Sequence, residues 1–271
     1  MRFSVVALLA LICGIGGCAV PQAQDTPVWQ WYEKDRVSGR GFYIYVPSTY
    51  NQHRPAPLIV TCHGTPPFDI AEHHIREWKM LGERNGCIVV APQLTATDGL
   101  LGDGPVAGML ADERCILSII SELGYRYNID RNNIMITGFS GGGFPTYWVG
   151  LRHPEIFSVV VARNCNFSAG NLDGWYTPEA VKTPVMVYYG EHDPGAIQGQ
   201  SNDAIKYLQS RGFVVNWVVL PGVGHERRPE YAMDFFRKNW RMPRPTISNS
   251  GLWGNSSSPP PAAGQTVAGN K

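Results

Sequence analysis

The chain has 271 residues, of which 44% are hydrophobic and 17% are charged. This composition fits a globular protein with a sizeable core, in one large domain or two small ones. The formal net charge is +1 and no long run of one sign occurs, which argues against nucleic acid as the main partner, because nucleic-acid binders usually carry a basic patch.

The chain begins with a segment that is typical of a targeting signal. Residues 1–18, "MRFSVVALLALICGIGGC", place Arg2 before an apolar stretch too short for a comfortable membrane span, and we predict a secretory signal peptide. The ending "IGGC" resembles a bacterial lipoprotein signal, in which Cys18 would carry the lipid. We therefore expect an exported protein on the periplasmic or extracellular side, with membrane contact only through that lipid. The alternative is ordinary cleavage near Ala23 without a lipid.

Seven short apolar stretches follow, and they read as strands. Continuous apolar runs are typical of parallel strands, because these are buried on both faces. The predicted strands are residues 41–47, 57–64, 87–92, 133–138, 157–163, 184–190 and 213–222.

Five helical candidates lie between or after these strands, at residues 71–85, 111–124, 141–152, 200–211 and 229–240. Such alternation predicts an α/β fold with a mostly parallel sheet over residues 27–242. In these sheets ligands bind beyond the carboxyl ends of the strands, so the loops that follow the strands should hold the chemistry. Residues 243–271 are rich in Pro, Gly, Ser and Asn, and we predict a disordered tail.

Four cysteines lie outside the predicted signal: Cys62, Cys87, Cys115 and Cys165. Their spacing matches no zinc pattern and no CxxC motif, and we expect them to pack as small buried apolar residues. Export would permit a disulfide, but the sequence favours no pairing.

The stretch "NIMITGFSGGGFP" holds a G-x-S-x-G pattern centred on Ser140. It lies between a predicted strand and a predicted helix, which is the context that a nucleophile elbow requires. Gly138 and Gly142 suit such a turn because the backbone is crowded there. The alternative is a glycine-rich turn that contains a serine by accident. We predict that Ser140 is a nucleophile.

A nucleophilic serine needs a base and an acid that orients the base, in the chain order serine, acid, histidine. Asp193 and Glu191 both follow the strand "PVMVYYG", and we favour Asp193 because it lies further into the loop, before Pro194. His225 follows the last strand in a glycine-flanked loop, and we predict that it is the base. His192 precedes the expected position of the base.

The other histidines, His53, His73, His74 and His153, read as surface or helix residues.

An oxyanion hole should accompany this triad, because negative charge forms on the former carbonyl oxygen. We predict the backbone N–H groups of Gly141 and Thr65 as its donors. His63, in "TCHGTPP", is expected to brace the Thr65 loop by hydrogen bonding.

Together these residues resemble the α/β-hydrolase fold. The strongest likeness is to the secreted serine esterases grouped with polyhydroxybutyrate depolymerases and feruloyl or acetyl-xylan esterases, and it extends from about Gly41 to Trp240. It rests on "GFYIYVP", "LIVTCHG", "NGCIVVAP", "YNIDRNNIMITGFSGGG", "YYGEHDP" and "GHE". The resemblance implies a central, mostly parallel sheet with helices on both faces, a Ser-Asp-His triad, no metal and no organic cofactor. The two prolines after Thr65 are a departure from the pattern.

The function that this resemblance implies is cleavage of a carboxylic ester, small or polymer-linked, through an acyl-enzyme on Ser140. A serine peptidase of the prolyl-oligopeptidase type and a catalytically inactive binding protein on the same scaffold are the alternatives. In the long loop 163–180, Trp175 and Tyr176 could form an aromatic wall for the substrate or could pack the loop against the core.

Overall fold

The computed structural model describes residues 30–99 and 106–241. The predicted signal peptide with Cys18 and the predicted tail at 243–271 lie outside the described residues. Within the described ranges, none of the helices combines the length and the apolar character needed to cross a membrane.

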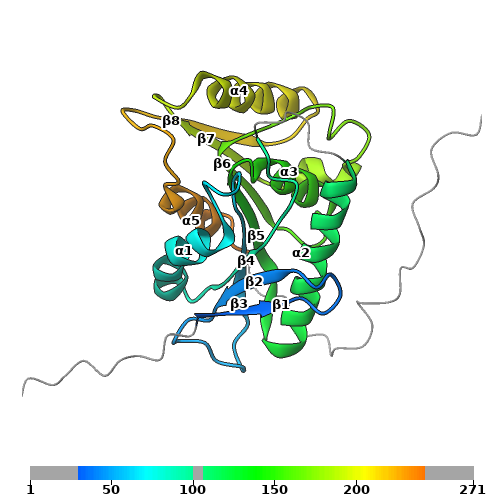
Figure 1. Ribbon diagram of the computed structural model, residues 1–271, viewed down its shortest axis with the longest axis vertical. Coiled ribbons are helices and arrows are strands. Elements are labelled where there is room, and N and C mark those ends of the chain that lie inside the picture. Colours follow the sequence, from blue (N-terminus) through cyan, green and yellow to red (C-terminus); the bar gives the residue numbers. More distant parts are fainter. Residues whose placement is uncertain (1–29, 100–105, 242–271) are drawn as a thin grey trace, which may run out of the picture.

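The described chain forms one eight-stranded sheet in the order β1-β2-β4-β3-β5-β6-β7-β8 (Figure 1). β1 pairs antiparallel with β2 and β2 antiparallel with β4, whereas all neighbours from β4 to β8 are parallel. The strands are β1 (Gln30–Lys34), β2 (Gly41–Tyr45), β3 (Ala56–Cys62), β4 (Ile88–Pro92), β5 (Ile129–Ser140), β6 (Val159–Cys165), β7 (Val185–Gly190) and β8 (Val215–Leu220). The carboxyl ends of β3 to β8 therefore share one edge.

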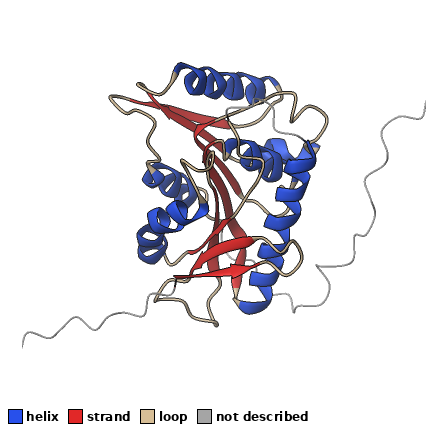
Figure 2. Ribbon diagram, in the orientation of Figure 1, coloured by secondary structure: helices blue, strands red, loops and turns tan. Residues whose placement is uncertain are grey.

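Helices cover both faces of the sheet (Figure 2). They are α1 (Ala71–Asn85), α2 (Val106–Arg126), α3 (Gly143–Arg152), α4 (Gly195–Ser210) and α5 (Pro229–Lys238), with a short 3-10 helix at Pro178–Lys182. α1 and α5 pack on one face, where Trp78 and Phe236 are fully buried. α2, α3 and α4 pack on the other.

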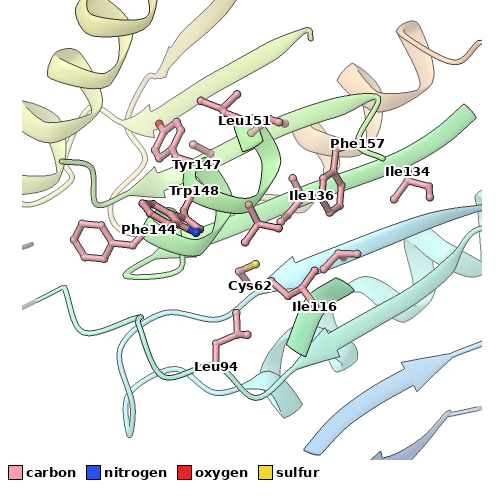
Figure 3. Close-up of a cluster of buried hydrophobic side chains, with 14 of the residues drawn as sticks. Cys62, Leu94, Ile116, Ile134, Ile136, Phe144, Tyr147, Trp148, Leu151 and Phe157 are labelled. Atoms are coloured by element: carbon pink, nitrogen blue, oxygen red, sulfur yellow. The ribbon is translucent and has the colours of Figure 1, made fainter. Parts of the chain in front are cut away.

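The larger apolar core lies between the sheet and α2, α3 and α4. Figure 3 shows Phe144, Tyr147 and Trp148 of α3 packed with Ile136 of β5 and Ile116 of α2. The four cysteines Cys62, Cys87, Cys115 and Cys165 are free and buried, and pack as small apolar residues as expected.

The predicted α/β architecture is confirmed, with differences at the element boundaries. β1 was not predicted, because this five-residue edge strand is too short and too polar to show a pattern. α4 begins at Gly195 rather than at residue 200. Its first turn shows no apolar pattern in the sequence, because it is exposed and buries only Ile197. α2 begins at Val106 rather than at residue 111.

Candidate active site

Ser140 lies at the junction of β5 and α3. Its φ is 52°, in the left-handed region that L-residues seldom adopt. A Cβ on Gly138 would lie 2.3 Å from the Gly142 carbonyl oxygen, and one on Gly142 would lie 2.4 Å from the Cys62 carbonyl oxygen. Both positions must therefore be glycine. The turn is a strained strand-to-helix elbow that lifts Ser140 to the carboxyl edge of the sheet.

The loop after β3 lies directly against Ser140. A Cβ on Gly64 would be 3.1 Å from the Ser140 Cβ, and one on Gly141 would be 2.9 Å from the Thr65 Oγ1. Thr65 and Gly141, whose N–H groups are the predicted oxyanion donors, are thus neighbouring residues. Within the described part of the chain, neither donates a hydrogen bond. Two unengaged donors therefore lie close to the serine.

His63 braces this loop as expected. Its Nδ1 lies 2.8 Å from the Gly64 carbonyl oxygen, and its Nε2 accepts the Leu94 N–H at 3.0 Å. Because Nε2 accepts, Nδ1 carries the proton and donates to Gly64. Burial lowers the pKa of His63, which favours this neutral form.

The structure brings Asp193 to His225. The Asp193 Oδ1 lies 2.6 Å from the His225 Nδ1, and the Asp193 side chain is fully buried whereas the imidazole is 30% exposed. Glu191, the alternative acid, is exposed, and its Oε2 accepts the Gly222 N–H at 2.8 Å. A buried carboxylate on Nδ1 leaves the other imidazole nitrogen, Nε2, available to a substrate or a nucleophile.

Two further donors hold the Asp193 carboxylate in place. Its Oδ2 accepts the Gly190 N–H at 2.6 Å and the Asn164 Nδ2 at 2.5 Å. Asn164 lies at the end of β6 with φ of 51°, and the same Nδ2 is 3.3 Å from the Gly224 carbonyl oxygen, next to His225. Asn164 was not singled out from the sequence. Asparagine adopts left-handed backbone more readily than most residues, but nothing else in the sequence marks this one.

Ser140 and His225 line one cavity of about 680 Å³. Its other lining residues are Thr65, Phe68, Asp69, Glu77, Phe139, Glu226, Arg227 and Pro229. Phe139, inside the elbow, stacks on the His225 ring with centroids 4.5 Å apart. Phe68, which lines the same cavity as Ser140, is 78% exposed and was not singled out from the sequence.

No hydrogen bond joins the Ser140 hydroxyl to His225 among those of residues 30–99 and 106–241. The two groups share the cavity but are not in contact as donor and acceptor. Such bonds are often long without substrate and tighten when it binds.

Trp175 and Tyr176 do not line this cavity. Trp175 packs on Trp148 at a centroid distance of 5.3 Å, and Arg152 donates to its carbonyl oxygen at 3.0 Å. Tyr176 packs edge-to-face on Phe213 at 5.3 Å. These contacts fit the packing alternative rather than a substrate wall.

The described residues contain no group of three or more His, Cys, Asp or Glu side chains that could hold a metal ion. His74, expected at the surface or on a helix, does lie on α1 but is fully buried.

Solved structures share this architecture. A thermostable esterase superposes with a TM-score of 0.59 at 22% identity, covering 79% of this chain and 63% of its own. A CE1 ferulic acid esterase from Anaeromyces mucronatus, solved with ferulic acid, superposes with a TM-score of 0.60 at 14% identity, covering 81% and 93%. The chain has the α/β-hydrolase fold.

Sequence comparison finds similarity to a peptidase family and to an esterase. The family model described as the prolyl oligopeptidase family matches residues 116–180, which include Ser140 but neither Asp193 nor His225. A bifunctional acetylxylan esterase/xylanase of Neocallimastix patriciarum is 24% identical over 186 residues, 69% of this chain and 25% of that protein. The chain thus spans about a quarter of the length of this curated relative.

Proposed function

We propose that the chain is a serine hydrolase that cleaves carboxylic esters through an acyl-enzyme on Ser140. The observation that carries this proposal is the 2.6 Å contact between the buried Asp193 carboxylate and the His225 imidazole, at the rim of the cavity that holds Ser140. The names of two similar proteins, an acetylxylan esterase/xylanase and a ferulic acid esterase, favour esters as the substrates.

Acylation begins when the Ser140 Oγ attacks the ester carbonyl carbon and His225 Nε2 takes the hydroxyl proton. The Asp193 carboxylate accepts the Nδ1–H of the imidazole, which fixes the tautomer and stabilises the cation that forms. The tetrahedral intermediate then collapses: the C–O bond to the leaving alcohol breaks, and His225 protonates that oxygen. The acyl group stays on Ser140.

The N–H groups of Thr65 and Gly141 are the donors for the oxyanion. Both are unengaged in the described chain, and the loop that holds Thr65 is braced by His63, so the donors need not reorganise as charge develops. Deacylation repeats the path with water: His225 removes a proton from water, hydroxide attacks the acyl carbon, and the Ser140 Oγ leaves with the proton.

A serine peptidase is the second candidate, because the prolyl oligopeptidase family model covers the elbow. The same triad serves either reaction, and the leaving group distinguishes them. Hydrolysis of a p-nitroanilide of proline at a rate comparable with that of the matched ester would favour the peptidase.

The experiment that tests the proposal is a pre-steady-state assay with p-nitrophenyl acetate, beside acetylated sugars and feruloyl esters. We expect a burst of one p-nitrophenol per folded molecule, because p-nitrophenoxide is a good leaving group and acylation should therefore be faster than deacylation. Ser140→Ala should fold and show no burst. An inactive wild type would favour the binding-protein alternative, and an active Ser140→Ala would reassign the nucleophile.

We also propose that the chain is exported and carries lipid on Cys18. The support is the charged, apolar and small-residue order of residues 1–18.

A further inference from the structure

A second set of charged side chains lies beside the serine cavity and outside the triad. We call it the Asp69 cluster, and its members are Asp69, His74, Glu77, Arg163 and Arg227. Three of them, Asp69, Glu77 and Arg227, line the same cavity as Ser140. Arg163 and His74 are fully buried behind them. Buried charges are costly unless they are paired, so the interactions of this cluster must offset the cost of burying it beside the cavity.

One side of Asp69 holds the loop that carries Thr65. The Asp69 Oδ2 accepts the Gly64 N–H at 2.7 Å, and the Asp69 N–H donates to the Thr65 carbonyl oxygen at 3.0 Å. The Gly64 carbonyl oxygen between them is bound by His63. Every polar backbone group around the Gly64–Thr65 peptide is therefore hydrogen-bonded, except the Thr65 N–H. A trans peptide points its N–H opposite to its C=O, so these hydrogen bonds fix the direction in which the Thr65 N–H points.

The other side of Asp69 holds the loop that carries His225. The Asp69 Oδ1 accepts the Arg227 Nη2 at 2.6 Å, and Arg227 lies two residues beyond His225. The Arg227 guanidinium also lies over the Phe139 ring at 5.4 Å, and its Nε is 3.5 Å from the Glu77 Oε2. The guanidinium is thus clamped between two carboxylates while it covers the elbow residue next to Ser140.

The chemistry of the cluster requires Asp69 to be ionised. Burial alone would raise the pKa of Asp69, but hydrogen bonds from His74 and the Gly64 N–H, together with the Arg227 charge, hold it well below its usual range. Burial lowers the pKa of His74. The neutral imidazole donates from Nε2 to the Asp69 Oδ2 at 2.8 Å, and its Nδ1 accepts the Thr61 hydroxyl at 2.7 Å. An uncharged amide at position 69 would present a donor to at least one of these donors.

We infer that Asp69 is a positioning residue: through Gly64 on one side and Arg227 on the other, it holds the Thr65 loop and the His225 loop at the spacing that acyl transfer needs. The inference rests on the proposed function, since it assigns roles around the same serine. The two loops are far apart in sequence, with Arg227 158 positions after Asp69, and this pair joins them by a direct charge-assisted hydrogen bond.

Arg227→Gln tests the pair, with Arg227→Lys as the conservative variant and Arg228→Gln as the matched control. Arg228 neighbours Arg227 but pairs with the exposed Glu226 at 2.8 Å. We expect Arg227→Gln to lower kcat for p-nitrophenyl acetate by about tenfold or more, with KM changed by less than about threefold, because the lost contact is a charge-assisted hydrogen bond. Arg227→Lys should recover most of kcat, and Arg228→Gln should match the wild type.

The readouts separate positioning from other roles. Rates are divided by the concentration of folded protein measured by circular dichroism, because a variant with slow acylation also gives a smaller burst, and thermal midpoints are recorded for every variant. A rise in KM at unchanged kcat would make Arg227 a substrate contact and overturn the inference. A lower midpoint at unchanged kcat would make the pair merely structural and overturn it too.

Asp69→Asn removes the carboxylate that joins the two loops. We expect a larger loss of kcat than in Arg227→Gln, and the double variant should be no slower than Asp69→Asn alone, since both changes break one connection. If Asp69→Asn does not fold, the two Arg227 variants decide the question alone. A wild type without ester hydrolysis would refute the proposed function, whereas an active wild type with unaffected Arg227→Gln would refute only this inference.

Discussion

Asn164 offers a sharp perturbation of the candidate site, because one amide nitrogen contacts both the acid and the histidine loop. Its Nδ2 donates to the Asp193 Oδ2 at 2.5 Å and lies 3.3 Å from the Gly224 carbonyl oxygen. Asn164→Ala and Asn164→Gly both remove these contacts. They differ in the backbone, since Asn164 has φ of 51°, which glycine adopts freely and alanine does not.

The magnitudes follow from these contacts. A hydrogen bond to a charged group contributes about 1.5–3 kcal/mol, so its full loss would slow the reaction by about 10- to 150-fold. Asp193 keeps the Gly190 N–H, so we expect the lower end of that range. A left-handed backbone costs alanine about 1–2 kcal/mol, whereas at ordinary positions glycine is the less stable of the two residues.

We therefore expect both variants to lose about tenfold in kcat, with Asn164→Gly at least as stable as Asn164→Ala. The assay is p-nitrophenyl acetate turnover per folded site, beside urea unfolding of each variant. The control is Gln198→Ala, which removes a contact to the Asp193 carbonyl oxygen and leaves the Asp193 carboxylate untouched. Wild-type kcat in both Asn164 variants would show that the Asn164 amide does not support the Asp193–His225 pair.

Four further predictions follow from the structure and the sequence. Asp193→Asn should lower kcat by up to about 10⁴-fold while Glu191→Gln stays near the wild type, because only Asp193 contacts His225; the reverse ranking would reassign the acid. Gly141→Ala should lower both kcat and the thermal midpoint, since its Cβ would lie 1.8 Å from the Thr97 carbonyl oxygen; wild-type values would show that the elbow can relax. Burial lowers the pKa of His153, but its hydrogen bonds to Glu113 and Glu155 raise it to about 9. The charged imidazole therefore contributes its full share to the free energy of unfolding below pH about 6.5, and this share is lost as the pH rises through about 9. Urea unfolding at a series of pH values should show this loss of stability, at most about 3 kcal/mol, and His153→Gln should abolish it. An equal dependence of the free energy of unfolding on pH in both proteins would show that His153 is not the group responsible. Cys18→Ser should release the protein from the membrane fraction of an expressing bacterium, and unchanged fractionation would remove the lipid proposal.

The positions of most strands along the chain could be predicted because burial on both faces leaves continuous apolar runs in the sequence. The runs at β3, β4 and β7 are of this kind, and the structure has strands there. β1 lacks such a run because it is a short edge strand, and its neighbour β2 supplies its hydrogen bonds. The early start of α4 left no apolar periodicity, because its first turn faces solvent.

The placement of Ser140 could be predicted because the glycines that permit the elbow are adjacent in sequence. Asp193 and His225 could be placed by chain order and strand ends. Asn164 and Asp69 could not, since their significance lies in partners that are distant in sequence: Asp193 is 29 positions from Asn164, and Arg227 is 158 from Asp69. A single sequence carries no pattern for such pairs. The position of Trp175 depends in the same way on a stack with Trp148.

The most direct test of the central claim is active-site labelling with a fluorophosphonate, followed by peptide mapping by mass spectrometry. We expect folded protein to gain one phosphonyl group on Ser140, and heat-unfolded protein and His225→Ala to gain little or none, because the hydroxyl then has no base. Folded wild type that stays unlabelled at Ser140, or His225→Ala that is labelled as well as the wild type, would contradict the proposed triad.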